Sequence, residues 1–388
     1  MTPHADSLAL VLTGGGARAA YQVGVLRCLA RHLPGDSFDI ITGVSAGAIN
    51  AAFVASRHAP LSVAIDELSE VWRTLELKDV IRIDSRSLAR NVFGWGTKLI
   101  SGGSPVASRV QGLVDTTPLR QYLQRLFASN EKGEIAGIAE NIARGQPKAV
   151  AVTALDYTTG KTVTWASGRD IEMWTRPLRR GVREALTVDH IMASAALPLV
   201  FPAVRLGKHW YGDGGIRLSA PLSPALHLGA TRMLAISTHY SKSVSEADEP
   251  QVAGYPPPAQ ILGQLMDAIF LDVMDEDTLR LQRSNEFLQD LPHELRRGYR
   301  PVDFAVIRPS VDIGNLAAEY EPQLPRPFRF LTRSLGTRET SNADFMSLFM
   351  FVPEYLQRLM EIGEADADAR IEAITRVATA PATSQAAQ

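Results

Sequence analysis

Apolar runs and helical patterns alternate over the first half of the chain. Residues 8–12 form an apolar run typical of a buried strand, and a glycine turn leads from it into a helical pattern that reaches residue 33. Residues 38–42 form a second apolar run, after which Ser45 opens an alanine-rich helical stretch. This alternation predicts an α/β domain around a mainly parallel sheet.

Shorter elements follow in the second half. Residues 149–154 and 161–165 favour a β-hairpin, residues 189–196 a short helix, and residues 233–237 another core strand. The region 256–288 carries apolar residues at helical spacing. We find no internal repeat.

The composition changes near residues 241–258, which are acidic and then rich in proline. We therefore expect the α/β domain to span residues 1–240, and a helical extension packed on its core to span residues 241–375. Residues 376–388 are small, polar and uncharged after Arg376, which is typical of a disordered tail.

The composition of the 388-residue chain is that of an ordinary globular protein, with 45% hydrophobic and 21% charged residues. A net charge of −2 argues against nucleic acid as a partner. The one cysteine, Cys28, has no partner for an internal disulfide and is expected to be a buried apolar residue. The N-terminus has no signal-peptide pattern, and no apolar run approaches the ~20 residues of a spanning helix. We expect a cytoplasmic protein that is at most peripheral at a membrane.

Gly43, Ser45 and Gly47 form the motif G-x-S-x-G directly after the second apolar run. A serine on a sharp turn from strand to helix needs glycine on both sides, because larger residues would clash. Its hydroxyl then stands clear of the sheet at a helix N-terminus, where the helix dipole favours negative charge. The motif predicts that Ser45 is a nucleophile, and a plain hydroxyl in a glycine-rich turn is the alternative.

The earlier glycine turn, at residues 14–16, admits a different interpretation. Together with Ala19 it fits G-x-G-x-x-G/A, the fingerprint of dinucleotide binding. That fold needs an acidic residue at the end of the next strand, whereas Asp36 and Asp39 precede the apolar part of that strand. The nucleotide interpretation is therefore the weaker one.

A serine nucleophile needs an oxyanion hole. The backbone N–H groups of Gly14, Gly15 and Gly16 suit this role, because a parallel sheet brings the ends of neighbouring strands together and so places the turn beside Ser45. Glycine also permits the close approach that an oxyanion requires.

The base that would activate the serine is less obvious. Of the eight histidines, only His190 and His209 are open candidates for a triad. Asp213 is the stronger candidate, because it follows a short aromatic strand and stands in a turn with Gly214 and Gly215. A carboxylate buried beside the serine can act as base for labile esters when the oxyanion is stabilised separately. An ordinary Asp-Gly turn is the alternative.

Four motifs occur in the order GGGARAAYQVGVL, GVSAGAIN, ASAALPLVFPAV and YGDGG. This combination resembles the patatin-like phospholipase family, in particular its bacterial members, over residues 8–230. The resemblance implies a three-layer α/β/α sandwich with C-terminal helical additions. It also implies a lipid acyl hydrolase with a Ser-Asp dyad, in which Ser45 attacks the ester, Asp213 takes the proton and the glycine turn binds the oxyanion.

Two positions of the glycine turn need separate comment. Arg18 occupies the family's basic position, where it either stabilises the loop or meets a phosphate. Ala19 stands where the family usually has glycine, and we expect only a small change of geometry from it.

No Cys or His set has zinc spacing, so we expect a metal-independent enzyme without a cofactor.

Two further features admit a lipid-related interpretation. Arg176, Arg179, Arg180 and Arg183 could attract anionic headgroups, although a solvated helix face is the simpler expectation. The connection at residues 85–117 has the length of a lid or mobile loop. Its scattered apolar residues, which meet acyl chains or simply pack under the loop, are Phe93, Trp95, Leu99 and Ile100.

The leading hypothesis is a serine hydrolase acting on phospholipid, lysophospholipid or neutral acylglycerol. Acyl transfer to an alcohol uses the same residues and is a close variant. A non-catalytic lipid-binding or nucleotide-binding protein on the same scaffold is the alternative of a different class. The sequence leaves the headgroup, the acyl-chain length and the oligomeric state open.

Overall fold

The computed structural model describes most of the chain. The described residues are 6–33, 38–82, 112–248, 255, 261, 264–265, 268, 273–329 and 344–379. The expected lid residues Phe93, Trp95, Leu99 and Ile100 lie outside these ranges.

A ten-stranded sheet forms the centre of the described structure, with the strand order β10-β9-β1-β2-β3-β4-β6-β5. The strands are β1 (Leu8–Leu12), β2 (Ile40–Val44), β3 (Ala149–Asp156), β4 (Lys161–Gly168), β5 (Thr175–Arg176), β6 (Arg179–Arg183), β7 (Val204–Leu206), β8 (His209–Asp213), β9 (Arg232–Ile236) and β10 (Asp303–Ile307). The five strands from β10 to β3 are parallel, whereas β4 returns antiparallel to β3, as the hairpin pattern predicts. Strand β8 pairs with β3 and β7, off the main path.

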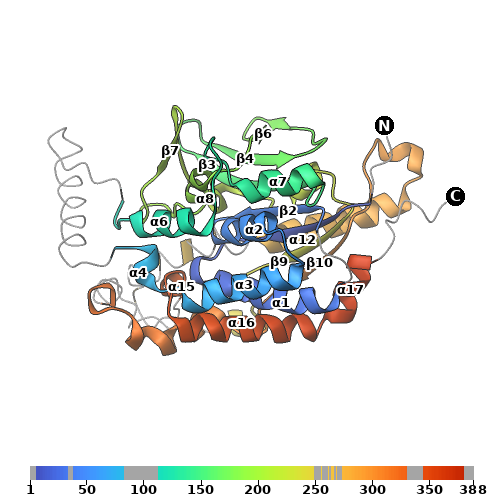
Figure 1. Cartoon of the computed structure of the whole chain (residues 1–388). Helices are drawn as coiled ribbons and strands as arrows, with labels where there is room; N and C mark the ends of the chain where they lie inside the picture. The colour runs from blue at the N-terminus through green and yellow to red at the C-terminus, as the bar shows by residue number, and fades with distance from the viewer. Residues whose placement is uncertain are drawn as a thin grey trace.

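Helices cover both faces of this sheet (Figure 1). The α-helices are α1 (Ala20–His32), α2 (Ala46–Ser56), α3 (Leu61–Thr74), α4 (Leu77–Val80), α6 (Thr117–Leu126), α7 (Ala136–Arg144), α8 (Val188–Ser194), α9 (Ser223–His227), α10 (Val244–Ala247), α12 (Val273–Asp290), α13 (Ile313–Leu316), α15 (Asp344–Ser347), α16 (Pro353–Asp368) and α17 (Ile371–Thr379). Short 3₁₀ helices are η1 (Gly16–Ala19), η2 (Gly214–Arg217), η3 (His293–Arg296) and η4 (Ala317–Gln323). Within the described ranges, every helix is too short or too polar to cross a lipid bilayer.

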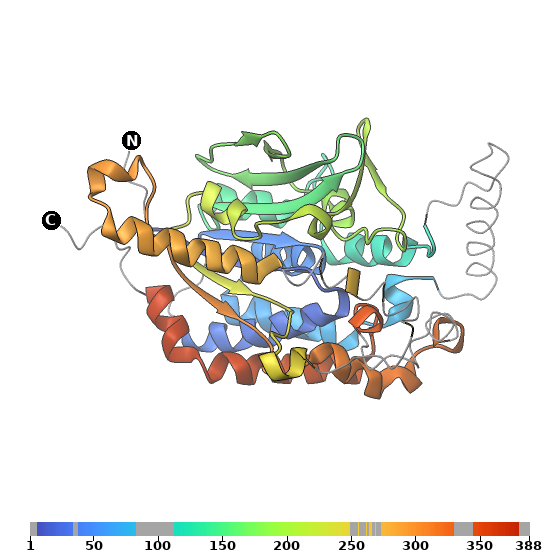
Figure 2. The same cartoon turned by 180° about the vertical axis from the view of Figure 1, so that it is seen from behind.

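Alternation along β1 shows how the sheet separates two cores. Leu8, Leu10 and Leu12 pack with α1, α2, α3 and α16 on one face, whereas Ala9 and Val11 pack with α9 and α12 on the other. Figure 2 shows α12 lying across that second face. Successive side chains of a strand point to opposite faces, so a strand buried on both faces is apolar throughout. The expected three-layer α/β/α fold with C-terminal helices is confirmed.

The C-terminal part contributes more than the helices that the sequence pattern predicts. Strand β10 pairs in parallel with β9 and forms an edge of the main sheet. Helix α16 packs along α1 and α3 (Figure 1). Helix α17 continues to Thr379, past the expected start of a disordered tail at residue 376.

The arginine cluster does not lie on a helix face, and that interpretation is wrong. Arg176 lies on β5, and Arg179, Arg180 and Arg183 lie on β6, which pairs in parallel with β4. Pairing with an existing sheet edge overrides the weak helical preference of an arginine-rich segment.

Candidate active site

Ser45 occupies the sharp turn between β2 and α2. Its backbone has φ 57° and ψ −131°, in a region that residues other than glycine rarely adopt. A Cβ atom at Gly43 would collide with the backbone of Gly47, and one at Gly47 with the carbonyl oxygens of Leu12 and Thr13. Both glycines of the motif are therefore required by the tight packing of this turn.

The sheet register brings Asp213 to the same place. Val44, the last residue of β2, pairs with Thr153 of β3. The next residue of β3, Ala154, pairs with Asp213, the last residue of β8. Because β4 occupies the whole other edge of β3, β2 and β8 share one edge and end against each other. Ser45 and Asp213 therefore meet where these two strands end.

The Asp213 carboxyl group is completely buried. Its Oδ1 accepts a hydrogen bond from the Gly215 N–H at 2.8 Å. Its Oδ2 has no hydrogen bond of ordinary geometry to any described residue, although the Ser45 hydroxyl is near enough to lower the carboxyl pKa. Burial is the stronger influence and raises the pKa of Asp213 to about 7. At Gly214, a Cβ atom would collide with the carbonyl oxygen of Thr153.

The glycine turn after β1 lies against the same serine. A Cβ atom at Gly14 would stand 3.0 Å from the Cβ of Ser45. Gly15 and Gly16 have φ of 149° and 54°, which glycine adopts without strain. The N–H groups of these three glycines form no hydrogen bond to any described residue, which leaves them free to bind a ligand oxygen.

Two later segments hold this turn in place. The Thr238 hydroxyl, just after β9, donates to the Gly14 carbonyl oxygen at 2.6 Å. On the other side, the Ala17 N–H donates to the Leu348 carbonyl oxygen at 3.0 Å. The buried Arg18 donates through Nε to the Ser347 hydroxyl at 2.6 Å. This contact favours the loop-stabilising role among the two that the sequence leaves open for Arg18.

Neither candidate histidine forms a hydrogen bond with Ser45 in the described structure. His190 is buried against Trp165, and its Nδ1 lies 2.9 Å from the Thr187 hydroxyl at the start of α8. Burial lowers the pKa of His190 to about 4. His209 pairs through Nδ1 with Asp156 at 2.9 Å, near the β3–β4 turn. Both have structural partners elsewhere.

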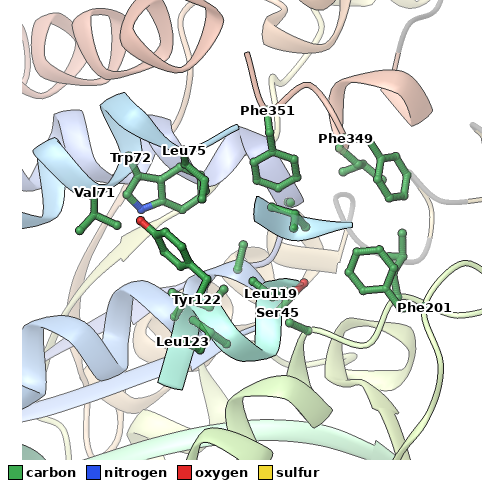
Figure 3. A pocket seen from close by; sticks show the side chains of 18 of the residues that line it. Ser45, Val71, Trp72, Leu75, Leu119, Tyr122, Leu123, Phe201, Phe349 and Phe351 are labelled. Carbon is green, nitrogen blue, oxygen red and sulfur yellow. The ribbon is translucent and has the colours of Figure 1, made fainter. Parts of the chain in front are cut away.

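An apolar pocket extends from Ser45 and holds about 810 Å³ of empty space, open solvent included. Figure 3 shows Ser45 between the rings of Phe201 and Phe349 on one side and Val71, Trp72 and Tyr122 on the other. Its walls come from α3, α6, the segment after α8 and the segment after α15. The side chains that line it are Ser45, Ala46, Ile49, Val71, Trp72, Leu75, Val80, Leu119, Tyr122, Leu123, Leu126, Ala195, Leu197, Phe201, Leu348, Phe349 and Phe351.

Other potential ligand groups lie apart from Ser45. The Asp39 carboxylate accepts the Leu8 N–H at 2.8 Å, at the end of the sheet opposite to the glycine turn. Cys28, His32 and Asp368 form the one group of potential metal ligands within the described ranges, where α1 and α16 end. Neither place adjoins the pocket.

Comparison with known proteins places these features in a family. The family model described as patatin-like phospholipase matches residues 10–226, which is more than half of the chain. The calcium-independent phospholipase A2-gamma of mouse is 27% identical over 223 residues, and the human protein is 26% identical over the same length. Each alignment covers 56% of this chain and 25% of the relative, so the chain matches about a quarter of the length of these relatives.

Similar solved structures include human GIVD cytosolic phospholipase A2, with a TM-score of 0.44 and 11% identity over 97% of this chain and 59% of that one. VipD from Legionella pneumophila has a TM-score of 0.37 and 14% identity over 95% of this chain and 67% of that one. The family model includes the glycine turn, the serine turn and Asp213 in one continuous match. The chain belongs to the patatin-like phospholipase family.

Proposed function

We propose that the chain is a serine lipid acyl hydrolase that cleaves acyl esters through Ser45 and Asp213. The observation that carries this proposal is the meeting of a strained serine and a buried carboxyl group at the wall of an apolar pocket. Perturbed acid groups and strained backbone are typical of active sites.

The reaction has two steps. In the first, the Ser45 hydroxyl attacks the ester carbonyl carbon, Asp213 accepts its proton, and the N–H groups of Gly14, Gly15 and Gly16 stabilise the oxyanion. The tetrahedral species collapses to an acyl-enzyme, and the leaving alcohol takes the proton from Asp213. In the second step, water attacks the acyl-enzyme while Asp213 accepts its proton. The free acid leaves and Ser45 recovers its hydrogen.

The pocket supports a fatty acyl group as the part of the substrate that is recognised. Its lining is apolar apart from Ser45, the Trp72 indole N–H and the Tyr122 hydroxyl, so it suits an alkyl chain. The names of the relatives support a phospholipase A that works without calcium, and a lysophospholipase would use the same groups. An acyltransferase or a neutral-lipid esterase would use the same groups. Adding an alcohol acceptor distinguishes acyl transfer from hydrolysis, because only a transferase forms the new ester.

Contact with a membrane surface belongs to the same proposal. Arg176, Arg179, Arg180 and Arg183 lie on the outer strands β5 and β6, and Leu178 between those strands is 52% exposed. Cationic edges of this kind attract anionic lipid. Sedimentation with vesicles checks this. Binding to phosphatidylglycerol vesicles should weaken when all four arginines are replaced by glutamine, and equal binding would contradict it.

The test of the proposed function combines a fluorophosphonate probe with chromogenic acyl esters. Wild-type protein should be labelled and should turn over the esters. Ser45→Ala should abolish labelling, and Asp213→Asn should lower turnover by a factor of at least 10³, because the base is lost while its shape is kept. Turnover by Ser45→Ala at the wild-type rate would contradict the proposal. Nucleotide binding without esterase activity would support the non-catalytic alternative.

A further inference from the structure

The side chain of Ser194, the last residue of α8, contacts the backbone of the proposed nucleophile Ser45. Its side chain is completely buried. Its Oγ accepts a hydrogen bond from the Ser45 N–H at 2.9 Å, and its hydroxyl donates to the carbonyl oxygen of Thr153 at 2.7 Å. One hydroxyl therefore links the turn that carries the nucleophile to the strand β3 beside it.

This link stands where the ladder between β2 and β3 ends. Val44 pairs with Thr153, and the chain then leaves the sheet at Ser45 with a φ of 57°. A buried backbone N–H needs an acceptor, and a strained residue keeps its conformation only where the surroundings hold it. The Ser194 hydroxyl meets both needs. It accepts the hydrogen bond of the Ser45 N–H, and through its bond to Thr153 it holds the Ser45 backbone in place beside β3.

The same segment also holds the other member of the dyad. The Asp213 N–H donates to the carbonyl oxygen of Ala196 at 2.9 Å. Two hydrogen bonds, from Ser194 and from Ala196, thus connect one short stretch of chain to the backbones of Ser45 and Asp213. Ala195 and Leu197 of this stretch line the pocket, but Ser194 itself does not.

We propose that Ser194 is a positioning residue, whose hydroxyl aims the Ser45 side chain at Asp213. Because the Ser45 N–H already donates to the Ser194 hydroxyl, it is not free to bind the oxyanion, and that role falls to the glycine turn at residues 14–16. This proposal rests on the proposed function, because it concerns the geometry of the same reaction. A positioning residue outside the pocket changes the chemical step and leaves binding of the acyl chain unaltered.

The first test is the steady-state kinetics of Ser194→Ala with chromogenic esters. We expect kcat to fall ten- to a hundredfold, with KM unchanged within twofold. Labelling by the fluorophosphonate probe should slow by a similar factor, because it reports the reactivity of Ser45 directly. Ser194→Thr restores a hydroxyl and should recover most of the activity, whereas Ser194→Cys keeps the volume without a good hydrogen bond and should not.

A matched control is Ser56→Ala, since Ser56 is also buried and its hydroxyl also bonds to a backbone carbonyl oxygen, at the far end of α2. It should keep wild-type kcat. A second readout is the pH profile. The Ser45 hydroxyl lowers the carboxyl pKa of Asp213, so a misdirected Ser45 should move the profile of Ser194→Ala to higher pH.

Three outcomes separate the two proposals. If Ser45→Ala retains full turnover, the proposed function fails. If Ser45→Ala is inactive while Ser194→Ala matches the wild type in kcat and labelling, only the positioning role is overturned. It is also overturned if Ser194→Ala, Ser194→Cys and Ser194→Thr all lose activity in proportion to a loss of folded protein in thermal unfolding, because that pattern indicates packing alone.

Discussion

At the scale of single residues, Asp213 shows how burial without a counter-charge raises the pKa of a carboxyl group, here that of the proposed base. Only the Ser45 hydroxyl and the Gly215 N–H favour its charged form, and burial opposes it more strongly. The resulting pKa of about 7 lies near neutral pH, where a general base is most effective. A salt bridge to the carboxylate would lower this pKa and weaken the base.

This pKa leads to a prediction for the pH dependence of activity. Asp213 must be deprotonated to accept the serine proton, and its raised pKa means that protonation begins just below neutral pH. We expect kcat/KM to be flat at alkaline pH, to bend near pH 7, and to fall about tenfold per pH unit below the bend. Ester hydrolysis measured across this range provides the check. A bend near the ordinary aspartate pKa of about 3.9 would contradict the raised pKa of the proposed base.

The sequence predicts some of the site residues better than others. Ser45, Gly14 and Asp213 are recognisable because each stands in a turn whose glycines have a steric reason. Ser194 lies in the motif ASAALPLVFPAV, but the sequence assigns no role to its hydroxyl, and Thr238 stands next to an apolar run without any local signal. Their partners are fixed only by the sheet register, which joins segments far apart in the chain.

At the scale of elements, the packing of α1 against α16 depends on two glycines. A Cβ atom at Gly24 of α1 would collide with the backbone of Met360 on α16. In return, a Cβ atom at Gly363 of α16 would collide with the carbonyl oxygen of Tyr21 on α1. The two backbones therefore touch directly, and α1 is joined to the glycine turn of the candidate site by the short helix η1.

Gly24→Ala should destabilise the fold, although alanine is the better helix former. Forcing a methyl group into this contact costs about 1–3 kcal/mol, which exceeds the gain of about 1 kcal/mol in helix propensity. Urea unfolding measures the difference. The control Glu361→Ala, on the exposed side of α16, should stay within about 0.5 kcal/mol of the wild type. Wild-type stability of Gly24→Ala would show that the helices have room to separate.

Elements also differ in how far the sequence predicts them. Strands β1, β2 and β9 are continuous apolar runs because both of their faces are buried. The strand β6 is not recognisable from the sequence, because its residues are only partly buried and its arginines give it no alternating apolar pattern. It is a strand because it pairs with β4 on one side and with the short β5 on the other.

At the scale of the whole molecule, the pocket is lined by residues from both halves of the chain. Val71, Trp72 and Tyr122 come from the first half, whereas Leu348, Phe349 and Phe351 come from beyond the part that the family model matches. The sequence gives no sign of this, because pocket walls from distant segments are brought together only by the fold. The C-terminal extension therefore forms part of the apolar pocket at Ser45.

A pocket of this shape predicts a test by acyl-chain length. Val71 lines its far part, so Val71→Phe should obstruct the end of a long chain. Excluding two methylene groups costs about 1.6 kcal/mol, so kcat/KM for a palmitoyl ester should fall about tenfold while a butyryl ester is unaffected. The same change at Val63, which is 45% exposed on α3, is the control and should alter neither. An equal loss for both esters with Val71→Phe would contradict this assignment of the pocket.

The place of β1 in the sheet also has a consequence for biosynthesis. This strand leaves the ribosome before the other strands of the described sheet, yet one of its two neighbours is β9, which pairs Leu8 with Arg232. One edge of β1 therefore has no strand to pair with until β9 has been translated. Contacts so distant in sequence form slowly, and a strand edge exposed in the meantime invites aggregation. We expect the nascent chain to depend on chaperones until β9 emerges, and the yield of soluble protein to rise when translation and folding are slowed by cold.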